Sequence, residues 1–600
     1  MTPCPCGSGL RRLRCCDLDL ATVSPGAATT QLDPQVEAAT AALASGETER
    51  GLAGLVAVLE LAPARVDALF ALARLHRAAG RARPAETLLR RIVAIDPNDF
   101  PATNELTLML LGRGAAAEAE VHARNAVRIA PSSPQAHNLM GLAMTEGNRP
   151  LVGEYHYREV LRLLGRDDPT TFGNLAWNLK MQGRIEEARA LYAKAAALAP
   201  DTLQVLLGWA RTEEADRRLD RAQELLDAAG RVAPGHAGVA LTRATVLARQ
   251  GRIDQALGLL DEDGRGEALG PAEQAERGRL LDRLGRYDEA FAAFDGAKRR
   301  ALELGGRRYE AQAAETLAAR LRGFFTARRL ATLPRAATRR DVAQPIFIVG
   351  FPRSGTTLIE QTLSVHARIE AGDELHYVFD IAGLIPRLLG SPLAYPDALC
   401  ELWMGDHREG LDLLRDHYLA LVRQAGLMRA GASWFTDKMP LNETHLGLIH
   451  LMFPEAPIVH VLRHPLDVVL SVYSNFLTHG FCCAAELETT ARHYALIAGM
   501  VAHYRENLPG LRYLAVRYED VVDHQEREVR RILDFIGEAF DPRCLNFEEN
   551  RRYARTASYA QVTEKLYDRA RYRHLNYRAQ LAPAAAILAP VIERLGYAVP

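Results

Sequence analysis

The sequence predicts a multidomain protein in which an all-α array of helix pairs is followed by an α/β domain built on a parallel sheet. Two observations carry this prediction. Residues 35–325 repeat at intervals of about 34 residues, the length of a two-helix unit. From residue 344 onward, short apolar segments alternate with amphipathic ones, as in parallel strands joined by helices. We expect a small motif at 1–20, the array at 35–325, a linker at 326–343 and the α/β domain at 344–600.

The composition is that of an ordinary protein with several folding units. Of 600 residues, 48% are hydrophobic and 24% are charged, and the net charge of −1 does not favour non-specific binding to nucleic acids or membranes. No window reaches the ~20 apolar residues of a membrane helix, and the first residues lack the apolar stretch of a signal peptide. Four of the eight cysteines show no framework spacing. These features predict a cytoplasmic protein without a membrane span or a nucleic-acid partner.

The first twenty residues hold a compact cysteine cluster. In "PCPCGSGLRRLRCC", Cys4 and Cys6 precede a Gly-Ser-Gly turn, and Cys15 and Cys16 follow a short basic segment. Four thiolates brought together by one tight turn suit tetrahedral zinc, and free or redox-active thiols are the alternative. The stretch resembles the SEC-C motif, known from the C-terminus of a preprotein translocase ATPase. This resemblance implies that the four cysteines are zinc ligands.

Small residues at fixed intervals mark the repeats of residues 35–325. Three series keep the same period: Ala188, Ala222, Ala256 and Ala290; Gly46 and Gly80, with Gly251 and Gly285; and Pro63, Pro97 and Pro131. Small residues let paired helices approach closely, glycine marks the turn between them, and proline ends the second helix. The series resembles a tetratricopeptide array of about seven or eight units, with a less regular stretch near 147–170. Such arrays usually hold peptides or protein partners, whereas a mere spacer or dimerisation role is the alternative.

Four apolar segments of the α/β domain are predicted to be strands: "PIFIVG", "SWFTDK", "PIVHVL" and "RYLAVRY". In a parallel sheet covered by helices, ligands bind beyond the carboxyl ends of the strands. The residues that directly follow each strand are therefore the candidates for a binding site.

The first strand runs into the loop "GFPRSGTT", which has the outline of a phosphate-binding loop. Gly350 and Gly355 keep the spacing of the nucleotide-triphosphate loop G-x-x-x-x-G-K-[ST], but Thr356 stands in place of the lysine. Backbone N–H groups at a helix start bind an oxyanion, and side chains add further donors and charge. The candidate residues are Arg353, Ser354, Gly355, Thr356 and Thr357. Without the lysine, the loop favours a ligand that has no γ-phosphate, which disfavours a kinase or NTPase.

The third predicted strand is followed by "LRHPLDVVLS", with Arg463 at the strand end and Ser471 on the helix behind it. Together with the loop, this segment resembles the sulfotransferases that depend on 3′-phosphoadenosine 5′-phosphosulfate (PAPS). Among them, the bacterial tetratricopeptide sulfotransferases and the tyrosylprotein sulfotransferases are the most similar in motif. The resemblance covers residues 344–580. It implies that residues 352–357 bind the 5′-phosphosulfate and that Arg463 and Ser471 bind the 3′-phosphate.

The same resemblance implies roles for residues further along the chain. Tyr518 in "VRYED" corresponds to a tyrosine that lines the nucleotide site, and Ser558 in "TASYAQV" falls on a late loop that covers the cofactor. The family has a further arginine about one helical turn beyond the serine, a position that here is Asn475.

Sulfonate transfer builds negative charge on the leaving phosphate oxygen, so cations beside it should carry much of the catalysis. Arg353 and Lys438 are the candidates, and the resemblance places the family's catalytic lysine at Lys438 in "FTDKMP". The acceptor hydroxyl also needs a base. Glu374 is as far along the chain from Arg353 as the catalytic glutamate is from the loop arginine in tyrosylprotein sulfotransferases. His376 is the reserve candidate for the base, and a structural role for the carboxylate is the remaining alternative.

The sequence thus predicts an enzyme that transfers a sulfonate group from PAPS to an acceptor hydroxyl, with a protein or peptide tyrosine presented by the repeats as the expected acceptor. A glycan or small-molecule hydroxyl is compatible with the same residues. The alternative from another class is a non-catalytic tetratricopeptide scaffold whose sulfotransferase-like domain binds a nucleotide. The sequence does not predict the oligomeric state.

Overall fold

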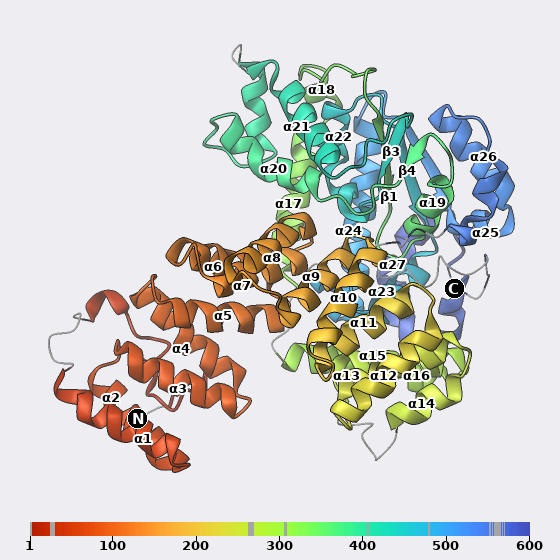
Figure 1. Cartoon of the computed structure of the whole chain (residues 1–600). Helices are drawn as coiled ribbons and strands as arrows, with labels where there is room; N and C mark the ends of the chain where they lie inside the picture. The colour runs from red at the N-terminus through yellow and green to blue at the C-terminus, as the bar shows by residue number, and fades with distance from the viewer. Residues whose placement is uncertain are drawn as a thin grey trace. The chain divides into compact units, whose positions relative to one another are not determined.

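The computed structural model of the chain contains two compact units, Met1–Gly208 with Leu304–Gly306 and Trp209–Glu303 with Arg307–Pro600 (Figure 1). The structure describes residues 3–23, 30–261, 269–304, 309–404, 407–477, 481–550 and 570–599, and in addition positions 552, 554, 556, 566 and 568. Within this described part, we find no helix with the length and apolar character that crossing a membrane requires.

The first unit consists of helices that each pack on their neighbours in sequence. These helices are α1 (Asp33–Ala44), α2 (Thr48–Leu61), α3 (Val66–Ala78), α4 (Ala82–Ile95), α5 (Phe100–Gly112), α6 (Ala116–Ile129), α7 (Pro134–Glu146), α8 (Pro150–Leu164), α9 (Pro169–Met181) and α10 (Ile185–Leu198). Alanine is buried at the predicted helix contacts, as at Ala188 with 0% exposure. The predicted solenoid of helix pairs is therefore confirmed.

A residue with left-handed backbone separates the two helices of each pair. The φ angle lies between 59° and 85° at Gly46, Gly80, Gly114, Asn148, Gly183, Arg217, Gly251 and Gly285. These positions follow one another at the regular interval of the repeats, except that the step from Asn148 to Gly183 is longer by a single residue. This inserted residue accounts for the less regular stretch near 147–170. Glycine therefore marks most of these turns in the sequence but not all of them, because Asn148 and Arg217 adopt the same left-handed conformation at some cost in backbone strain.

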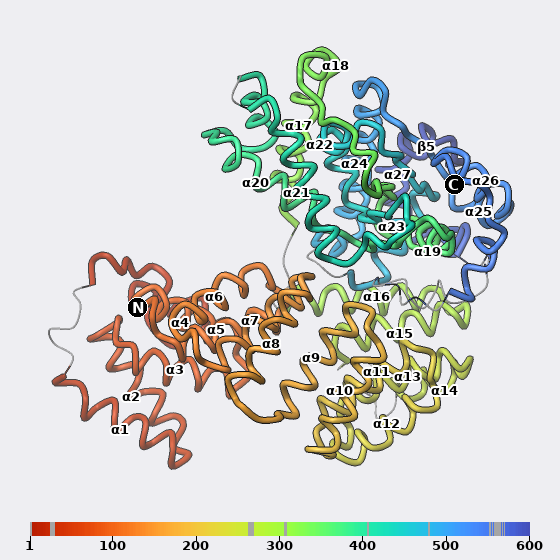
Figure 2. Tube along the Cα trace, turned by 45° about the horizontal axis from the view of Figure 1, so that its top comes forward, coloured from red at the N-terminus to blue at the C-terminus, as the bar shows by residue number. Residues whose placement is uncertain are grey.

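The second unit begins within α11 (Leu203–Ala215) and continues the array with further helices. These are α12 (Leu219–Val232), α13 (Ala237–Arg249), α14 (Ile253–Asp261), α15 (Pro271–Arg283) and α16 (Tyr287–Glu303). Figure 2 shows that the pair α15 and α16 follows directly on α13 and α14.

The α/β domain is organised around a five-stranded sheet in which neighbouring strands pair in parallel. Its strands are β1 (Gln344–Val349), β2 (Ile369–Glu370), β3 (Trp434–Asp437), β4 (Ile458–Leu462) and β5 (Tyr513–Arg517), in the order β2-β3-β1-β4-β5. The four predicted strands are present, and β2 is additional. Because β2 is so short, it leaves no apolar run that the sequence could reveal.

Helices cover both faces of the sheet. Alternate residues of a strand point to opposite faces, so each face contributes to its own apolar cluster. In β1, Ile346 and Ile348 belong to one apolar cluster, whereas Phe347 and Val349 belong to the other. The helices of the domain are α17 (Ala311–Phe324), α18 (Ala327–Leu330), α19 (Thr356–Leu363), α20 (Tyr377–Leu388), α21 (Gly410–Gln424), α22 (Leu446–Met452), α23 (Pro465–Tyr473), α24 (Leu487–Asn507), α25 (Tyr518–Asp523), α26 (Gln525–Ile536) and α27 (Arg578–Arg594). Central β1 thus ends between α19 on one face and α23 on the other.

The segment 326–343, expected as a linker, packs against the α/β domain. It contains α18, and Leu330, Leu333 and Ala336 are buried in the domain's larger apolar cluster. The Ala336 N–H also donates to the Leu451 carbonyl at 2.9 Å. The α/β domain therefore includes part of this segment in its core.

The last helix pair of the array also packs on the α/β domain. The ring of Phe291 in α16 lies 5.6 Å from that of Tyr473 in α23 and 6.3 Å from that of Tyr577, measured between centroids. The Tyr473 hydroxyl donates to Asp295 at 2.9 Å, and Gln580 donates to Asp288 at 2.6 Å. These contacts explain why α15 and α16 fall in the same compact unit as the sheet.

We expect Phe291→Ala to lower the free energy of unfolding of the second unit by about 2–4 kcal/mol, because it removes an aromatic ring packed between α16 and two rings of the α/β domain. Urea unfolding followed by circular dichroism measures this loss. Leu413→Ala is the matched control, since Leu413 is 61% exposed and its truncation should change stability by less than about 0.5 kcal/mol. Equal midpoints for the two variants would contradict the packing role.

Candidate active site

The loop after β1 is built to bring backbone donors close to the sheet. Gly350 and Gly355 have φ angles of 148° and 110°. A Cβ on Gly350 would lie 2.4 Å from the Val461 carbonyl oxygen, and one on Gly355 would lie 2.8 Å from the Tyr518 ring. Only glycine fits both positions. The loop then enters α19 directly, so the N–H groups of its first turn and the positive end of its dipole face the space beyond β1.

Three residues predicted from separate segments meet beside this loop. The Arg353 side chain donates through Nε to the Ser471 hydroxyl at 3.1 Å, and Arg463 donates through Nη1 to the Arg353 carbonyl at 3.2 Å. The Arg463 guanidinium also lies 5.0 Å from the centre of the Tyr518 ring. Because β1 and β4 are adjacent parallel strands, their ends bring Arg353, Arg463 and Ser471 together as the sequence predicted.

Two buried donors in this cluster have no hydrogen-bond partner among the described residues. They are the Ser354 hydroxyl and the Arg463 Nε, in side chains that are almost fully buried. Leaving such groups unpaired costs free energy of about 1–3 kcal/mol each. An anionic ligand with acceptor oxygens would satisfy both, so the residues present fit a phosphate or phosphosulfate group.

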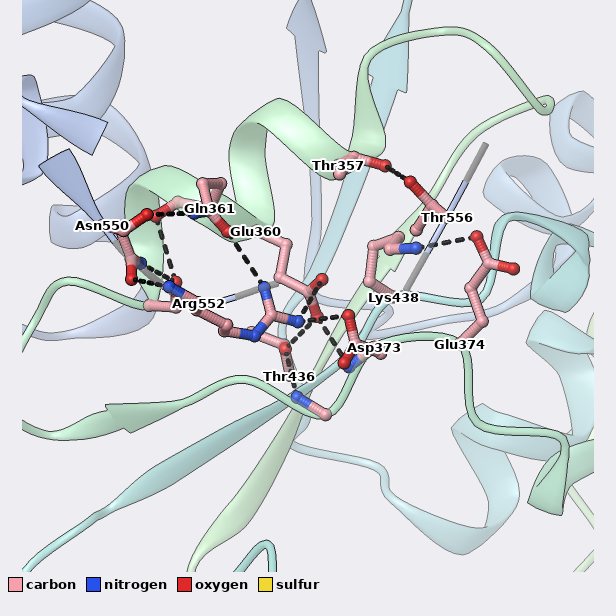
Figure 3. A network of polar contacts seen from close by, with 12 residues as sticks. Thr357, Glu360, Gln361, Asp373, Glu374, Thr436, Lys438, Asn550, Arg552 and Thr556 are labelled. Atoms are coloured by element: carbon pink, nitrogen blue, oxygen red, sulfur yellow. Dashed lines mark hydrogen bonds and ion pairs between the residues drawn. The ribbon is translucent and has the colours of Figure 1, made fainter. Parts of the chain in front are cut away.

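Lys438 and Glu374 form a second group on the other side of β1. Lys438 follows β3, is 0% exposed and donates to Glu374 through its ammonium at 2.7 Å. Its backbone N–H donates to the Asp373 carbonyl at 2.9 Å. Since β3 is the neighbour of β1, this ion pair and the phosphate-type loop lie at adjacent strand ends. Figure 3 shows the Lys438 ammonium directed at the Glu374 carboxylate.

A buried network holds the segment that carries Glu374. Arg552 pairs with Asp373 and with Glu360 of α19, at 3.2 Å for the latter. Glu360 in turn accepts the Asp373 N–H at 2.9 Å and the Thr436 hydroxyl at 2.6 Å. Figure 3 shows these groups converging from α19, β3, the Asp373 turn and the late segment around Arg552. Asp373 itself has a φ of 60°, so its backbone is held in the left-handed region by these contacts.

The same late segment continues along α19 toward the phosphate-type loop. Asn550 donates to the Ser364 hydroxyl at 3.0 Å near the end of α19, and the Thr556 and Thr357 hydroxyls lie 3.3 Å apart at its start. Ser558, slightly further on, lies outside the described residues. His376 is the residue before α20, and its ring centre lies 6.0 Å from that of Phe379.

The four N-terminal cysteines come together as predicted. Their sulfur atoms all lie within 4.8 Å of one another, and Cys4, Cys6 and Cys15 are buried. Four sulfurs around a zinc ion at ~2.3 Å would be about 3.8 Å apart, so the cluster is close to that size. The Ser8 hydroxyl lies 3.0 Å from the Cys15 sulfur, which adds a polar contact of the kind that orients a metal ligand. The donor set and spacing therefore fit zinc.

Comparison with known proteins shows which families the α/β domain and the helical array are similar to. Residues 345–542 match the sulfotransferase family. Residues 42–106 match a tetratricopeptide repeat model. The matched stretch includes the loop, the β4 end, Glu374 and Lys438, and thus every candidate active-site residue except those beyond residue 542.

Individual relatives are similar to this chain over part of its length. An uncharacterised protein of Aquifex aeolicus is 31% identical over 42% of this chain and 33% of its own length. Protein-tyrosine sulfotransferase 1 of Danio rerio is 27% identical over 42% of this chain and 72% of its own length. The nodulation protein NoeE of Sinorhizobium fredii is 29% identical over 36% of this chain and 54% of its own length. The chain thus spans a third to about half of the length of two of these relatives.

Two residues near the site were not predicted from the sequence. Arg552 lies in "NRRYART", where one arginine among several gives no signal of its ion pairs. Arg279 of α15 donates to the Asn475 side chain at 3.3 Å, although the two residues are far apart in sequence. A contact between a repeat and the α/β domain leaves no local motif, so only the fold could reveal it.

We expect Asp437→Asn to change the pH dependence of stability. Burial raises the pKa of Asp437 to about 7, although the Tyr418 hydroxyl and Asn442 donate to it. The Asp437 carboxyl loses its proton near pH 3.8 in the unfolded chain and near pH 7 in the folded chain. The folded state therefore becomes less stable relative to the unfolded state as pH rises between these two values. The variant should therefore gain roughly 2 kcal/mol over wild type from pH 5 to pH 8.

Urea unfolding at each pH measures this difference. The lost carboxylate contacts add an offset that does not depend on pH, so the slope and not the absolute stability is the readout. Asp341→Asn is the control, because the pKa of the exposed Asp341 is lowered to about 2 by Arg339 and the group stays ionised from pH 5 to pH 8. Parallel pH curves for wild type and Asp437→Asn would show that Asp437 does not titrate in this range.

Proposed function

We propose that the chain is a PAPS-dependent sulfotransferase that transfers a sulfonate group to an acceptor hydroxyl, with a protein or peptide tyrosine as the acceptor. The observation that carries this proposal is the pairing of two sites at adjacent strand ends. One is a lysine-free anion loop with Arg353, Arg463 and Ser471, and the other is the ion pair of Lys438 with Glu374. A non-catalytic scaffold that binds a nucleotide would need the anion loop but not the ion pair of Lys438 with Glu374.

The roles follow from where charge develops in the reaction. The acceptor oxygen forms a bond to sulfur, the bond from sulfur to the bridging phosphate oxygen breaks, and the leaving nucleotide takes up the negative charge. Arg353 and Lys438 are the cations placed to stabilise that oxygen. Glu374 is the base that accepts the hydroxyl proton, and His376 is the reserve candidate. The binding roles fall to Ser354, Gly355, Thr356, Thr357, Arg463, Ser471, Tyr518 and Ser558.

The tyrosine acceptor is supported by the relatives rather than by the site. Several of them are named protein-tyrosine sulfotransferases, whereas NoeE is named only as a nodulation protein. A tetratricopeptide array suits the presentation of a protein or peptide to the domain that follows it. A glycan or a small phenol would use the same base and cations.

We expect Arg353→Ala to weaken binding of the product nucleotide, adenosine 3′,5′-bisphosphate, by about 100-fold or more, because it removes a charge-assisted contact and the partner of Ser471. Calorimetry without magnesium measures the affinity. The control is Arg387→Ala, which changes an exposed arginine on α20 and should leave the affinity unchanged. An unaltered affinity of Arg353→Ala would overturn the assignment of the loop.

Transfer of labelled sulfonate from PAPS to panels of tyrosine peptides, glycans and small phenols tests the reaction itself. Glu374→Ala should lower transfer by roughly 10²–10⁴-fold while nucleotide affinity stays close to that of wild type, since general bases contribute about this much. Transfer at the wild-type rate would remove Glu374 as the base. Magnesium-dependent ATP hydrolysis in place of transfer would favour the NTPase alternative.

The cysteine cluster is proposed to bind one zinc ion through Cys4, Cys6, Cys15 and Cys16. Purified wild type should contain zinc in a one-to-one ratio by atomic emission, and Cys6→Ser should lose it together with thermal stability of the first unit. Cys400→Ser is the control, because Cys400 lies far from the cluster in sequence and should leave the zinc content unchanged. Full zinc retention by Cys6→Ser would contradict the ligand assignment.

A further inference from the structure

The helix α23 carries Ser471, and its C-terminal end is contacted by the repeat array. Asn475 lies just beyond α23 and donates through Nδ2 to the Ser471 carbonyl at 2.7 Å. Its amide oxygen accepts from Arg279 of α15 at 3.3 Å, and its carbonyl oxygen accepts from Lys298 of α16 at 2.6 Å. Two cations of the last repeat pair therefore converge on the residue one helical turn beyond Ser471.

The orientation of Arg279 is fixed by its own helix. Glu276, one turn earlier on α15, binds the edge of the guanidinium formed by Nε and Nη2, at 2.8 Å for Nε. This leaves Nη1 as the group directed to Asn475. The Glu276 side chain is nearly buried, at 8% exposure, whereas that of Arg279 is 41% exposed, so a buried carboxylate holds a guanidinium that remains accessible. Arg279 is thus a pre-oriented donor at the junction.

The contact between Arg279 and Asn475 is of the kind that a ligand can replace. A hydrogen bond of 3.3 Å to a neutral amide is long compared with the roughly 2.7–2.9 Å of a charge-assisted bond to phosphate. The Asn475 side chain is short, so the Arg279 guanidinium that contacts its amide oxygen lies farther from α23 than Asn475 itself. Arg279 thus supplies a positive charge near the end of α23, which the neutral Asn475 does not.

These donors form a continuous row with the anion site. From the repeat side, Arg279 contacts Asn475, Asn475 contacts Ser471, Ser471 contacts Arg353, and Arg463 contacts the Arg353 backbone. Asp467 is the carboxylate closest to Arg463 in the described contacts, at 3.8 Å, and it accepts from His574 and the Tyr572 N–H. The row therefore places three guanidinium groups along α23, with Arg463 before its first residue and Arg279 beyond its last.

We propose that Arg279 of the repeat array is a binding residue for the nucleotide and contacts its 3′-phosphate beside Ser471. The last helix pair of the array then has a direct part in the active site, in addition to any part in holding an acceptor. Lys298 acts through the backbone, because its ammonium fixes the Asn475 carbonyl and with it the end of α23. This inference rests on the proposed function.

The test compares two nucleotides that differ by the 3′-phosphate. Arg279→Gln should weaken binding of adenosine 3′,5′-bisphosphate by roughly 10–100-fold, the value of a lost hydrogen bond to a charged group. Binding of adenosine 5′-monophosphate, which lacks the 3′-phosphate, should stay within about twofold of wild type. Arg283→Gln is the matched control on the same helix, where the arginine donates to the Ala248 carbonyl, and it should change neither affinity.

A second variant separates a ligand contact from a structural effect. Adding Asn475→Arg to Arg279→Gln returns a guanidinium to the same place from the other side of the junction, and we expect it to restore at least part of the lost affinity for the bisphosphate. Circular dichroism and the monophosphate affinity report whether each variant is folded.

Each outcome decides between the explanations. An unchanged bisphosphate affinity of Arg279→Gln, or an equal loss for both nucleotides, overturns the contact with the 3′-phosphate. A selective loss that Asn475→Arg restores supports it. If wild type itself does not bind the bisphosphate, both the proposed function and this role of Arg279 fail. If wild type binds it and Arg279→Gln binds it equally well, only the role of Arg279 fails.

Discussion

The candidate active site of the α/β domain depends on the buried ion pairs of Arg552 with Glu360 and Asp373. The Arg552 side chain is 21% exposed and the Glu360 side chain 0%. These pairs connect α19, which receives the anion loop, with the turn that carries Glu374. Because Glu360 also accepts from the Asp373 N–H and from Thr436 of β3, one carboxylate orients three elements. Removing either partner would leave an uncompensated charge in the interior, which commonly costs about 3–5 kcal/mol.

Close backbone approach imposes a second constraint on the same turn. A Cβ on Gly372 would lie 2.0 Å from the Thr436 carbonyl oxygen, so the chain at this position can pass β3 only as glycine. Asp373 then turns in the left-handed region, and its carbonyl accepts from the Lys438 N–H. The backbone that presents Glu374 is thereby joined to the backbone that presents Lys438. The ion pair of Lys438 with Glu374 follows from this path of the backbone through Gly372 and Asp373.

The sequence was informative where function depends on local pattern. Strands ending in polar residues identified Arg353, Lys438 and Arg463, because a parallel sheet collects such ends at one edge. The regular period of small residues identified the array, and the inserted residue before Gly183 produced the less regular stretch. Arg552 and Arg279 were out of reach, since each acts through contacts with residues far away in sequence and neither belongs to a local motif.

The contacts of α15 and α16 with the α/β domain restrict how such a chain can vary in length. Asp282 accepts from Arg573 and Tyr577, and Asp288 accepts from Gln580, so the final repeat is fitted to one surface. At the other end, Arg11 of the cysteine motif pairs with Glu60 of α2, and His76 of α3 contacts the Ser8 carbonyl. Both terminal repeats are therefore specialised. Duplication or loss of a helix pair at either end would remove these contacts, and the pair α11 and α12 is also tied to the α/β domain, since Arg217 between them donates to the Glu548 carbonyl.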